Sequence, residues 1–318
     1  MAGNILVTGG AGFIGSHLCE ALLVKGISVA CVDSFSDYYS PQRKRSNIAG
    51  CSKSKSFRLY ECDVLELEKL SGVFQKEKPS LVIHLAAAVG VRNSIANPQD
   101  YVDVNVKGTA NILELCRQHG VKKLVFGSSS SVYGMNSKVP FSESDPVDSP
   151  ASPYAATKRA GELLCKSYHN LYGIKCICLR FFTVYGPRGR PDMAPYKFTD
   201  LISRGKPIDV FGDGSSGRDY TYVADIVSGI MAAAEKEFGF EIFNLGNFQV
   251  VKLAELIAAI ETAVGKKASV NRMPLQKGDM PLTYADISKA RKLLGWQPRT
   301  KIVEGIGRLV DWYRQEQQ

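Results

Sequence analysis

A tyrosine and a lysine four residues apart form the most reactive pair that the sequence offers. They are Tyr154 and Lys158, in the string Tyr-Ala-Ala-Thr-Lys. Ser152 is a good helix N-cap and Pro153 a good first helical residue, so this string is expected to open a helix. The i, i+4 spacing then places the phenol and the ammonium on one helix face. Because a nearby cation lowers the pKa of a phenol, Tyr154 is a candidate base for removing the proton of an alcohol.

Serines gather where an apolar run ends, over Ser128–Ser131, just before Val132-Tyr133-Gly134. That run is predicted to be a parallel strand, and sites in open α/β sheets lie at the carboxyl ends of strands. A Tyr-x-x-x-Lys spacing alone is weak, since about one chance occurrence is expected in a chain with 14 tyrosines. The serine-rich strand end is what favours a catalytic interpretation of the pair.

A glycine-rich turn near the N-terminus could hold a dinucleotide. The string Thr8-Gly-Gly-Ala-Gly-Phe-Ile-Gly15 matches Gly-x-Gly-x-x-Gly from Gly10, and the shifted version of that pattern from Gly9. Glycines let the backbone approach a pyrophosphate closely, and the following helix N-terminus attracts its charge. A second strand ends in Asp33, whose carboxylate would bind ribose hydroxyls and repel a 2′-phosphate. NAD is therefore expected rather than NADP.

Short apolar runs alternate with helical segments over the first 180 residues. Strands are expected at Asn4–Thr8, Ser28–Val32, Phe57–Glu61, Leu81–Leu85, Leu124–Ser128 and Lys175–Arg180, and helices at Gly12–Lys25, Glu66–Lys76, Asp100–His119 and Ser152–Tyr172. This alternation predicts an α/β fold with a Rossmann-type doubly wound parallel sheet.

Beyond Phe182 glycines and prolines interrupt the pattern, which predicts a second, smaller part. Residues 1–180 are expected to form the NAD-binding Rossmann domain, and residues 181–318 a smaller α/β domain that binds the substrate. Helices are expected there at Leu253–Val264 and Ile287–Leu294. A strand near 241–245 is the exception, because it could rejoin the first sheet.

The composition is that of an ordinary globular chain. Of the 318 residues 45% are hydrophobic and 22% charged, and the mean hydropathy is −0.09. No apolar run approaches the ~20 residues that span a bilayer. The first residues lack the basic segment and cleavage site of a secretory signal, so a cytoplasmic protein without membrane contact is expected.

The net charge and the cysteine content indicate which kinds of binding partner are expected. The net charge is +9, but the basic residues are not interleaved with aromatic ones, so no nucleic-acid partner is expected. An anionic small substrate is compatible with this charge. The eight cysteines contain no Cys-x-x-Cys, so no metal site is expected and the thiols should be reduced. At least one of Cys176 and Cys178 should be a core residue.

Taken together, these strings resemble the extended short-chain dehydrogenase/reductase family over essentially the whole chain. The residues that carry the resemblance are Thr8–Gly15, Asp33, Asp63-Val64, His84–Ala88, Asn105, Ser128–Gly134, Tyr154–Lys158, Arg180–Pro187 and Gly217–Tyr220. The resemblance implies a Rossmann domain that holds NAD and a C-terminal domain that binds a nucleotide-diphosphate sugar. It also implies a homodimer that pairs helices around Asp100–His119 and Ser152–Tyr172.

The resemblance assigns roles to individual residues. Ser129, Tyr154 and Lys158 are the expected catalytic residues. The expected NAD-binding residues are Gly9, Gly12, Phe13, Ile14, Asp33, Asp63, Val64, Leu85, Ala86, Ala87, Asn105, Tyr154 and Lys158. The expected substrate-binding residues are Arg92, Ser129, Thr183, Arg190, Arg218, Asp279 and Thr283, of which Arg218 would bind the diphosphate and Asp279 the uridine ribose. Many relatives place an arginine where this chain has Gln276, and Lys277 or Arg272 could substitute for it.

Within the family, four strings are most similar to the UDP-glucuronate 4-epimerases. They are Asp33–Tyr39, Gly90-Val91-Arg92, Arg180–Pro187 with Thr183 inside it, and Gly189–Ala194. This similarity implies 4-epimerisation of UDP-glucuronate to UDP-galacturonate, with hydride removed and returned at C4 through a 4-keto intermediate. Arg190 and Arg92 are candidates to hold the sugar carboxylate in a paired hydrogen bond. For each arginine, a surface position or a diphosphate contact is the alternative.

Three alternative functions stay open at this point. The small Thr283 leaves room for other sugar substituents, so UDP-glucose or UDP-N-acetylglucosamine could be the substrate of a 4-epimerase. UDP-glucuronate decarboxylation is disfavoured because related decarboxylases carry acidic residues where this chain has Ser130 and Ser131. A binding module without catalysis is disfavoured by the intact Ser129, Tyr154 and Lys158.

Overall fold

The computed structural model describes residues 3–274 and 282–317. By its backbone contacts the chain divides into two compact units. Unit 1 comprises Met1–Asn136, Ser144–Phe181 and Val227–Phe243. Unit 2 comprises Ser137–Glu143, Phe182–Ile226 and Asn244–Gln318. Each unit is therefore built from separate stretches of sequence.

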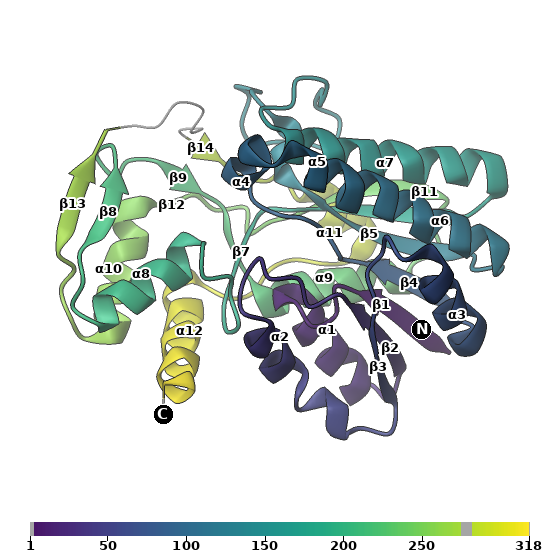
Figure 1. The fold of residues 1–318 in the computed structure, drawn as a ribbon. Coiled ribbons are helices and arrows are strands. Elements are labelled where there is room, and N and C mark those ends of the chain that lie inside the picture. The colour runs from purple at the N-terminus through teal and green to yellow at the C-terminus, as the bar shows by residue number, and fades with distance from the viewer. Residues whose placement is uncertain (1–2, 275–281, 318) are drawn as a thin grey trace. The chain divides into compact units, whose positions relative to one another are not determined.

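Seven strands form the central sheet (Figure 1). In spatial order they are β11 (Phe240–Leu245), β6 (Lys175–Phe181), β5 (Lys123–Ser129), β4 (Leu81–His84), β1 (Asn4–Thr8), β2 (Ser28–Asp33) and β3 (Phe57–Glu61). The pairs from β6 to β3 are parallel. β11 also runs parallel to β6. The Cys176 amide donates to the Gly239 carbonyl and the Phe182 amide to the Leu245 carbonyl, so residue numbers rise in the same direction along both strands. From β1 the sheet is extended in one direction by β2 and β3, and the chain then crosses back to add β4 and the later strands on the other side of β1. This order is the Rossmann arrangement and confirms the expected fold.

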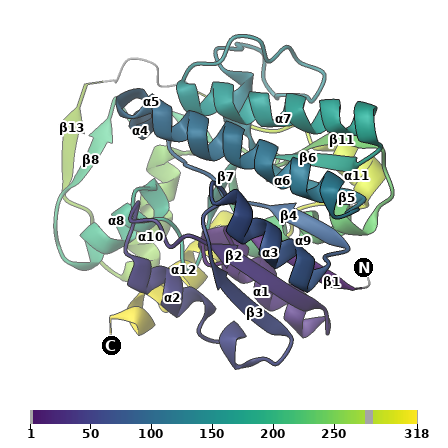
Figure 2. The ribbon, with the colours of Figure 1, turned by 45° about the vertical axis from the view of Figure 1, so that its right-hand side comes forward.

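Helices cover both faces of this sheet. On one face α3 (Leu67–Glu77), α6 (Gly108–Gln118) and α7 (Pro153–Tyr172) lie side by side, as Figure 2 shows. Their apolar residues join alternate strand residues such as Leu6, Val82 and Leu124 in one core cluster. On the other face α1 (Phe13–Val24) packs against β1 and β2. The intervening strand residues, such as Val7 and Ile83, are buried as well. This two-sided burial is why the strands read as nearly unbroken apolar runs.

The prediction of one continuous helix over Asp100–His119 is wrong in detail. The structure has α5 (Pro98–Tyr101), then a π-helical turn η2 (Val102–Lys107), and then α6. A π-helical turn carries hydrogen bonds one residue longer than an α-helix does, and such turns occur frequently at functional sites. Asn105 lies within it. The periodicity of the side chains alone does not show that one turn of the helix contains an additional residue.

Several elements were not predicted from the sequence. In the first 136 residues these are α2 (Pro41–Ile48), the short turn η1 (Cys51–Lys53), α4 (Val91–Ala96) and the turn η3 (Ser130–Tyr133). α9 (Val223–Glu235) follows later in the chain. α2 is rich in Arg and Lys and lacks a strong apolar stripe, so hydrophobic periodicity did not mark it.

Unit 2 is built from short strands and helices. Its small sheets are β7 (Thr183–Tyr185) with β10 (Tyr220–Tyr222), β8 (Ile208–Phe211) with β13 (Val270–Met273), and β9 (Gly217–Arg218) between β12 (Val251–Lys252) and β14 (Leu282–Thr283). Its helices are α8 (Ala194–Ser203), α10 (Leu253–Val264), α11 (Ser288–Leu294) and α12 (Ile302–Glu316). α8, α10 and α12 pack against one another. The predicted helix Leu253–Val264 coincides with α10, and the other predicted helix begins one residue before α11.

All eight cysteines are buried and none is in a disulfide. Cys176 and Cys178 are both fully buried in the core, as expected for at least one of them. Among the helices of residues 3–274 and 282–317, none combines the length and the apolarity that crossing a membrane requires.

Candidate active site

The glycine turn between β1 and α1 is shaped for close approach of a ligand. Gly9 adopts a φ of +68°, which favours glycine, and its amide donates to the Val32 carbonyl at 2.8 Å. A Cβ on Gly15 would collide with the Gly9 carbonyl oxygen. The N-cap of α1 is Gly12, so no side chain caps the helix that Phe13 and Ile14 begin. The free N–H groups of this first turn therefore suit a pyrophosphate.

Two acidic residues stand at the ends of the next strands. The buried Asp33 ends β2, where its Oδ2 accepts from the Ala11 amide at 3.0 Å and its Oδ1 from the Phe35 amide at 2.9 Å. These bonds orient the carboxylate while leaving acceptor capacity for hydroxyl groups. Asp63 follows β3 and accepts from the Leu65 amide at 2.9 Å. Val64 beside it is buried, and a Cβ on Gly108 would press into its side chain.

The loop after β4 is held by side chains from two other elements. The Leu85 amide donates to the Thr8 carbonyl at 3.1 Å, and the Ala86 amide to the Thr8 hydroxyl at 3.2 Å. Ala87 lies between these contacts and those of Asn105, whose Oδ1 accepts from the Ala88 amide at 2.8 Å. The Asn105 Nδ2 donates to the Ala88 carbonyl and to the Thr157 hydroxyl, each at 3.0 Å. Asn105 thus ties this loop to α7 through its whole side-chain amide.

A buried histidine links β1 and the π-helical turn. His84 Nδ1 lies 2.6 Å from the Thr8 hydroxyl and its Nε2 lies 3.2 Å from the Thr109 hydroxyl, which donates to the Asn105 carbonyl at 2.6 Å. Burial, with a smaller contribution from the Lys158 ammonium, lowers the pKa of His84 to about 3. His84 is therefore neutral and structural at physiological pH.

The tyrosine and lysine of the predicted pair stand on the first two turns of α7. Ser152 caps this helix by accepting from the Ala155 amide at 3.2 Å, as predicted. Lys158 is 4% exposed, and its Nζ donates to the Gly127 carbonyl at 2.7 Å. Burial lowers the pKa of Lys158 to about 8, although the negative charge of Glu162 opposes this change. The Tyr154 ring packs edge-on against Tyr101, with 6.1 Å between ring centroids.

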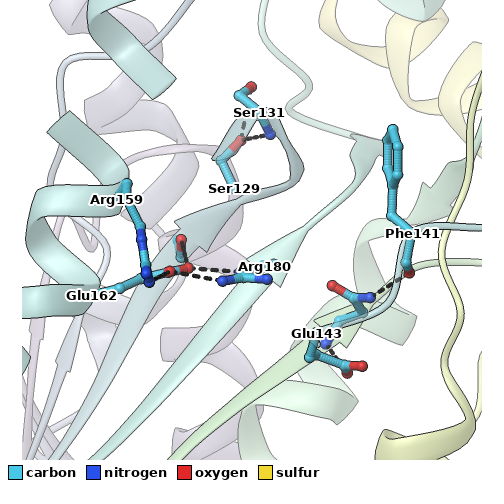
Figure 3. Close-up of polar contacts among 9 residues, drawn as sticks. Ser129, Ser131, Phe141, Glu143, Arg159, Glu162 and Arg180 are labelled. Carbon is cyan, nitrogen blue, oxygen red and sulfur yellow. Dashed lines mark hydrogen bonds and ion pairs between the residues drawn. The ribbon is translucent and has the colours of Figure 1, made fainter. Parts of the chain in front are cut away.

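Ser129 ends β5, two residues after the carbonyl that Lys158 binds. Its Oγ accepts from the Ser131 amide at 3.2 Å and lies 3.1 Å from the Ser131 hydroxyl, which keeps its side chain at the strand end (Figure 3). The structure therefore places Ser129 and the Tyr154–Lys158 helix at the carboxyl edge of the sheet, the edge at which β1 also leads into the glycine turn. A phenol, an ammonium and a hydroxyl at this edge can exchange a proton with an alcohol.

A buried ion pair beside Lys158 was missed by the sequence analysis. Glu162, one helical turn after Lys158, accepts from Arg180 at 2.8 and 2.9 Å, from Arg159 at 3.1 Å and from the Ser128 hydroxyl at 2.7 Å. Figure 3 shows the two arginines converging on this carboxylate. The signals were a Lys-x-x-x-Glu spacing on one helix and a lone arginine at the end of an apolar strand.

Three of the predicted substrate residues of unit 2, Thr183, Arg218 and Thr283, lie around one buried aspartate, Asp219. The Thr183 amide donates to the Asp219 carbonyl at 3.0 Å, and Arg218 is its neighbour in the chain. Thr283 pairs with Arg218 across β14 and β9. Burial raises the pKa of Asp219 to about 6, although hydrogen bonds from surrounding N–H and O–H groups oppose this change. The carboxylate binds the amides of Asn247, Phe248 and Ala285 and so holds three segments together.

The predicted arginines differ in their surroundings. Arg190 forms a two-point ion pair with Asp192, with Nε–Oδ1 and Nη2–Oδ2 distances of 3.0 and 2.6 Å. Arg92 lies exposed on α4. Arg272 lies on β13, with its Nη1 3.5 Å from the Gly212 carbonyl. Asp279, Gln276 and Lys277 lie outside the described residues.

The chain matches a known protein family. Residues 5–246 match the model of the NAD dependent epimerase/dehydratase family, so the chain belongs to that family. The expected extended short-chain dehydrogenase/reductase membership is confirmed.

Individual relatives are more specific. A UDP-glucuronate 4-epimerase of Thermodesulfobacterium geofontis is 46% identical over 314 residues, covering 98% of this chain and 97% of that protein. The crystal structure of a UDP-glucuronic acid 4-epimerase from Bacillus cereus, in complex with UDP-glucuronic acid and NAD, is 38% identical with a TM-score of 0.92, covering 98% of this chain and 99% of that one. A Thermotoga maritima UDP-glucose 4-epimerase with UDP-glucose is 33% identical, also with a TM-score of 0.92, covering 99% and 100%.

Proposed function

We propose that this protein catalyses the NAD-dependent 4-epimerisation of UDP-glucuronate to UDP-galacturonate. The observation that carries the proposal is the hydrogen bond from Lys158 to the Gly127 carbonyl, because Gly127 lies two residues before Ser129 on the same strand. The similarity to UDP-glucuronate 4-epimerases over nearly the whole chain supports the choice of sugar.

Unit 1 is the proposed NAD-binding domain. The glycine turn with Gly9, Gly12, Phe13 and Ile14 would take the pyrophosphate, and Asp33 the adenosine ribose. Asp63 and Val64 would flank the adenine, and Leu85, Ala86 and Ala87 would line the diphosphate and the nicotinamide ribose. Asn105 acts in this proposal by holding the loop of Leu85–Ala87 in place, since its own amide is bonded to Ala88 and Thr157. NAD bound by these residues would supply the acceptor, and then the donor, of the hydride at C4 of the sugar.

The three catalytic side chains divide the proton chemistry among them. Tyr154, as phenolate, removes the proton of the sugar 4-hydroxyl, and Ser129 hydrogen-bonds the same oxygen. The Lys158 ammonium stabilises the phenolate by its charge. Oxidation at C4 produces a 4-keto sugar. The 4-keto sugar then rotates so that its opposite face receives the hydride at C4, and Tyr154 returns the proton to the C4 oxygen. The overall reaction is therefore redox-neutral.

Unit 2 is the proposed nucleotide-sugar-binding domain. Arg218 would bind the diphosphate, and Thr183 and Thr283 would contact the sugar. Ser129 and Arg92 are proposed as further substrate-binding residues by resemblance alone. Asp279 is proposed for the uridine ribose by resemblance alone. Arg190 is proposed to hold the C6 carboxylate, because a guanidinium can bind a carboxylate at two points. In the structure its Nε–Nη2 edge binds Asp192 in this way, so the substrate carboxylate would replace Asp192 or use another edge.

The main alternative is 4-epimerisation of UDP-glucose. The similarity to the Thermotoga maritima enzyme favours it, since its TM-score equals that of the Bacillus cereus structure. Decarboxylation of UDP-glucuronate is less well supported, because Ser130 and Ser131 add no acidic group at the strand end.

A homodimer and a cytoplasmic location complete the proposal. α7 exposes Leu163, Leu171 and Tyr172, whose apolar surface suits a helix-to-helix contact with a second copy. Eight buried reduced thiols are typical of a protein from a reducing compartment.

The test is incubation of the purified protein, without added cofactor, with UDP-glucuronate, UDP-glucose and UDP-N-acetylglucosamine in separate reactions. Chromatography identifies each product. We expect UDP-galacturonate from UDP-glucuronate at the highest kcat/KM. A UDP-pentose with carbon dioxide would identify a decarboxylase, and a preference for UDP-glucose would establish the main alternative. Absence of any product would contradict an enzymatic role.

A further inference from the structure

Glu162 is a charged residue in the interior of unit 1, with no exposed surface. Its carboxylate is held in a side-on pair by Arg180, which is itself 1% exposed. The Arg180 guanidinium also lies over the Tyr133 ring, 4.9 Å from the ring centroid. Although burial alone would lower the pKa of Arg180, its hydrogen bonds and charge attraction to Glu162 raise that pKa above its ordinary value. Arg180 therefore remains charged.

The pair is tied to the strand that Lys158 binds. Ser128 and Arg180 are neighbours across β5 and β6. The Ser128 hydroxyl donates to Glu162, while the carbonyl of the preceding residue, Gly127, accepts from Lys158. Two successive turns of α7 are thus anchored to two successive residues of β5. A change at Glu162 would shift the backbone and the charge next to Lys158 together.

The charged groups near Lys158 indicate that Glu162 helps to keep the Lys158 amine protonated. Lys158 interacts with His84 on β4 and with Glu162 on its own helix. Around Glu162 lie Arg159 on α7 and Cys178 and Arg180 on β6, and the Arg180 guanidinium lies over Tyr133 in η3. His84 is neutral, and burial together with the charge of Glu162 raises the pKa of Cys178, so its thiol is neutral too. Glu162 is the anion of this set, and Arg180 balances its charge.

We propose that Glu162 and Arg180 form a positioning pair that keeps the Lys158 ammonium charged and in place beside Gly127, and through Lys158 supports the action of Tyr154 as a base. This inference rests on the proposed function, because it assigns the pair to the same proton transfer. Neither residue is a catalytic residue, since both act through Lys158. Arg159 is 26% exposed in its side chain and adds a weaker contact.

The test is the pH profile of kcat at saturating UDP-sugar and saturating NAD for Glu162→Gln and Arg180→Gln. The alkaline limb of the profile reports loss of the Lys158 proton. Without the Glu162 charge, the buried Arg180 cation disfavours a second cation, so we expect the limb to move by roughly one pH unit to lower pH. Without Arg180 the Glu162 charge is less balanced, so we expect the limb to move to higher pH. KM for the sugar should change less than about threefold in both variants, because neither residue is proposed to touch it.

Glu77→Gln is the matched control. Glu77 is also a buried glutamate of unit 1, paired with Arg58 at 2.8 Å and bonded to Asn4, but it lies at the end of α3. We expect a lower melting temperature and an unmoved alkaline limb. Arg180→Gln decides the question alone if Glu162→Gln fails to fold.

The inference would be overturned if the alkaline limb of the pH profile stayed at the wild-type position in both substituted enzymes. It would also be overturned if the limb moved in the same direction in both. The proposed function would survive that result, because the unsubstituted enzyme would still epimerise UDP-glucuronate. A different preferred sugar would overturn the substrate proposal but leave this test intact, since the profile can be recorded with whichever sugar reacts. An unsubstituted enzyme that converts none of the three sugars would overturn both.

Discussion

Lys158 donates a hydrogen bond of 2.7 Å from its Nζ to the backbone carbonyl oxygen of Gly127. A lysine on a helix surface would ordinarily extend into solvent, whereas this one is folded inward onto the end of β5. The contact restricts the ammonium to one position relative to Ser129, and burial brings the pKa of Lys158 down to about 8. Its charge is therefore strongly felt by neighbouring groups, because little water screens it.

Tyr154→Phe should abolish turnover while leaving the fold intact. The substitution removes only the phenolic oxygen, and loss of a general base lowers kcat by about 10²- to 10⁴-fold. Steady-state kinetics with UDP-glucuronate and a thermal melt measure the two effects. Tyr168→Phe is a control on the same helix, where the lost hydroxyl binds Glu114 at 3.3 Å. Near-normal activity of the Tyr154 variant would exclude this base.

Arg190→Ala should weaken binding of the uronate more than that of the neutral sugar. Hydrogen bonds to a charged group contribute about 1.5–3 kcal/mol, so we expect kcat/KM for UDP-glucuronate to fall roughly 10- to 100-fold. The value for UDP-glucose should change little. Arg204→Ala removes another arginine–aspartate pair of unit 2, to Asp200, as a control. Equal losses with both sugars would show that Arg190 does not bind the carboxylate.

Gly15→Ala should disrupt the glycine turn and reduce the NAD content of the purified protein. The new Cβ would collide with the Gly9 carbonyl and approach the Gly10 backbone, which are rigid atoms. Gly72→Ala is the matched control, because nothing lies within 4 Å of the position of its Cβ on α3. We expect that variant to gain about 0.5–1 kcal/mol in stability, as alanine is favoured in helices. NAD released by denaturation, measured by absorbance, compares the two.

His84→Gln should remove part of the acid sensitivity of the fold. The folded pKa of His84, about 3, lies below that of an unfolded histidine, so the unfolded chain binds an extra proton between pH 3 and 6.5. Stability of the native protein therefore falls as pH falls through that window, and His84 contributes up to about 1.4 kcal/mol per pH unit.

The glutamine variant should show a correspondingly shallower dependence. Urea unfolding at a series of pH values between 4 and 7 measures the slope. His119→Gln, at an exposed position at the end of α6, is the control substitution. An unchanged slope in the His84 variant would mean that acid unfolding proceeds through other groups.

Most strands of the central sheet were predictable from the sequence to within one residue. β1 and β3 coincide with the predictions. β1 reads as an apolar run because it is buried on both faces, whereas β3 is an edge strand whose residues are mostly exposed or half-buried. The π-helical turn around Asn105 was not predictable, since its extra residue is favoured by contacts to Ala88 and Thr157 rather than by side-chain periodicity. The basic helix α2 was not predicted because it has no strong apolar face.

The sequence by itself determined what depends on neighbours in the chain. The glycine turn, the cap at Ser152 and the i, i+4 relation of Tyr154 to Lys158 follow from local backbone geometry. Only the tertiary structure decided which groups meet across the chain. Lys158 reaches Gly127, Glu162 reaches Arg180, and His84 links Thr8 to Thr109 because strand order and register bring distant residues together. A carboxylate and a guanidinium become a buried pair when both are removed from water, and that depends on packing rather than on spacing in the sequence.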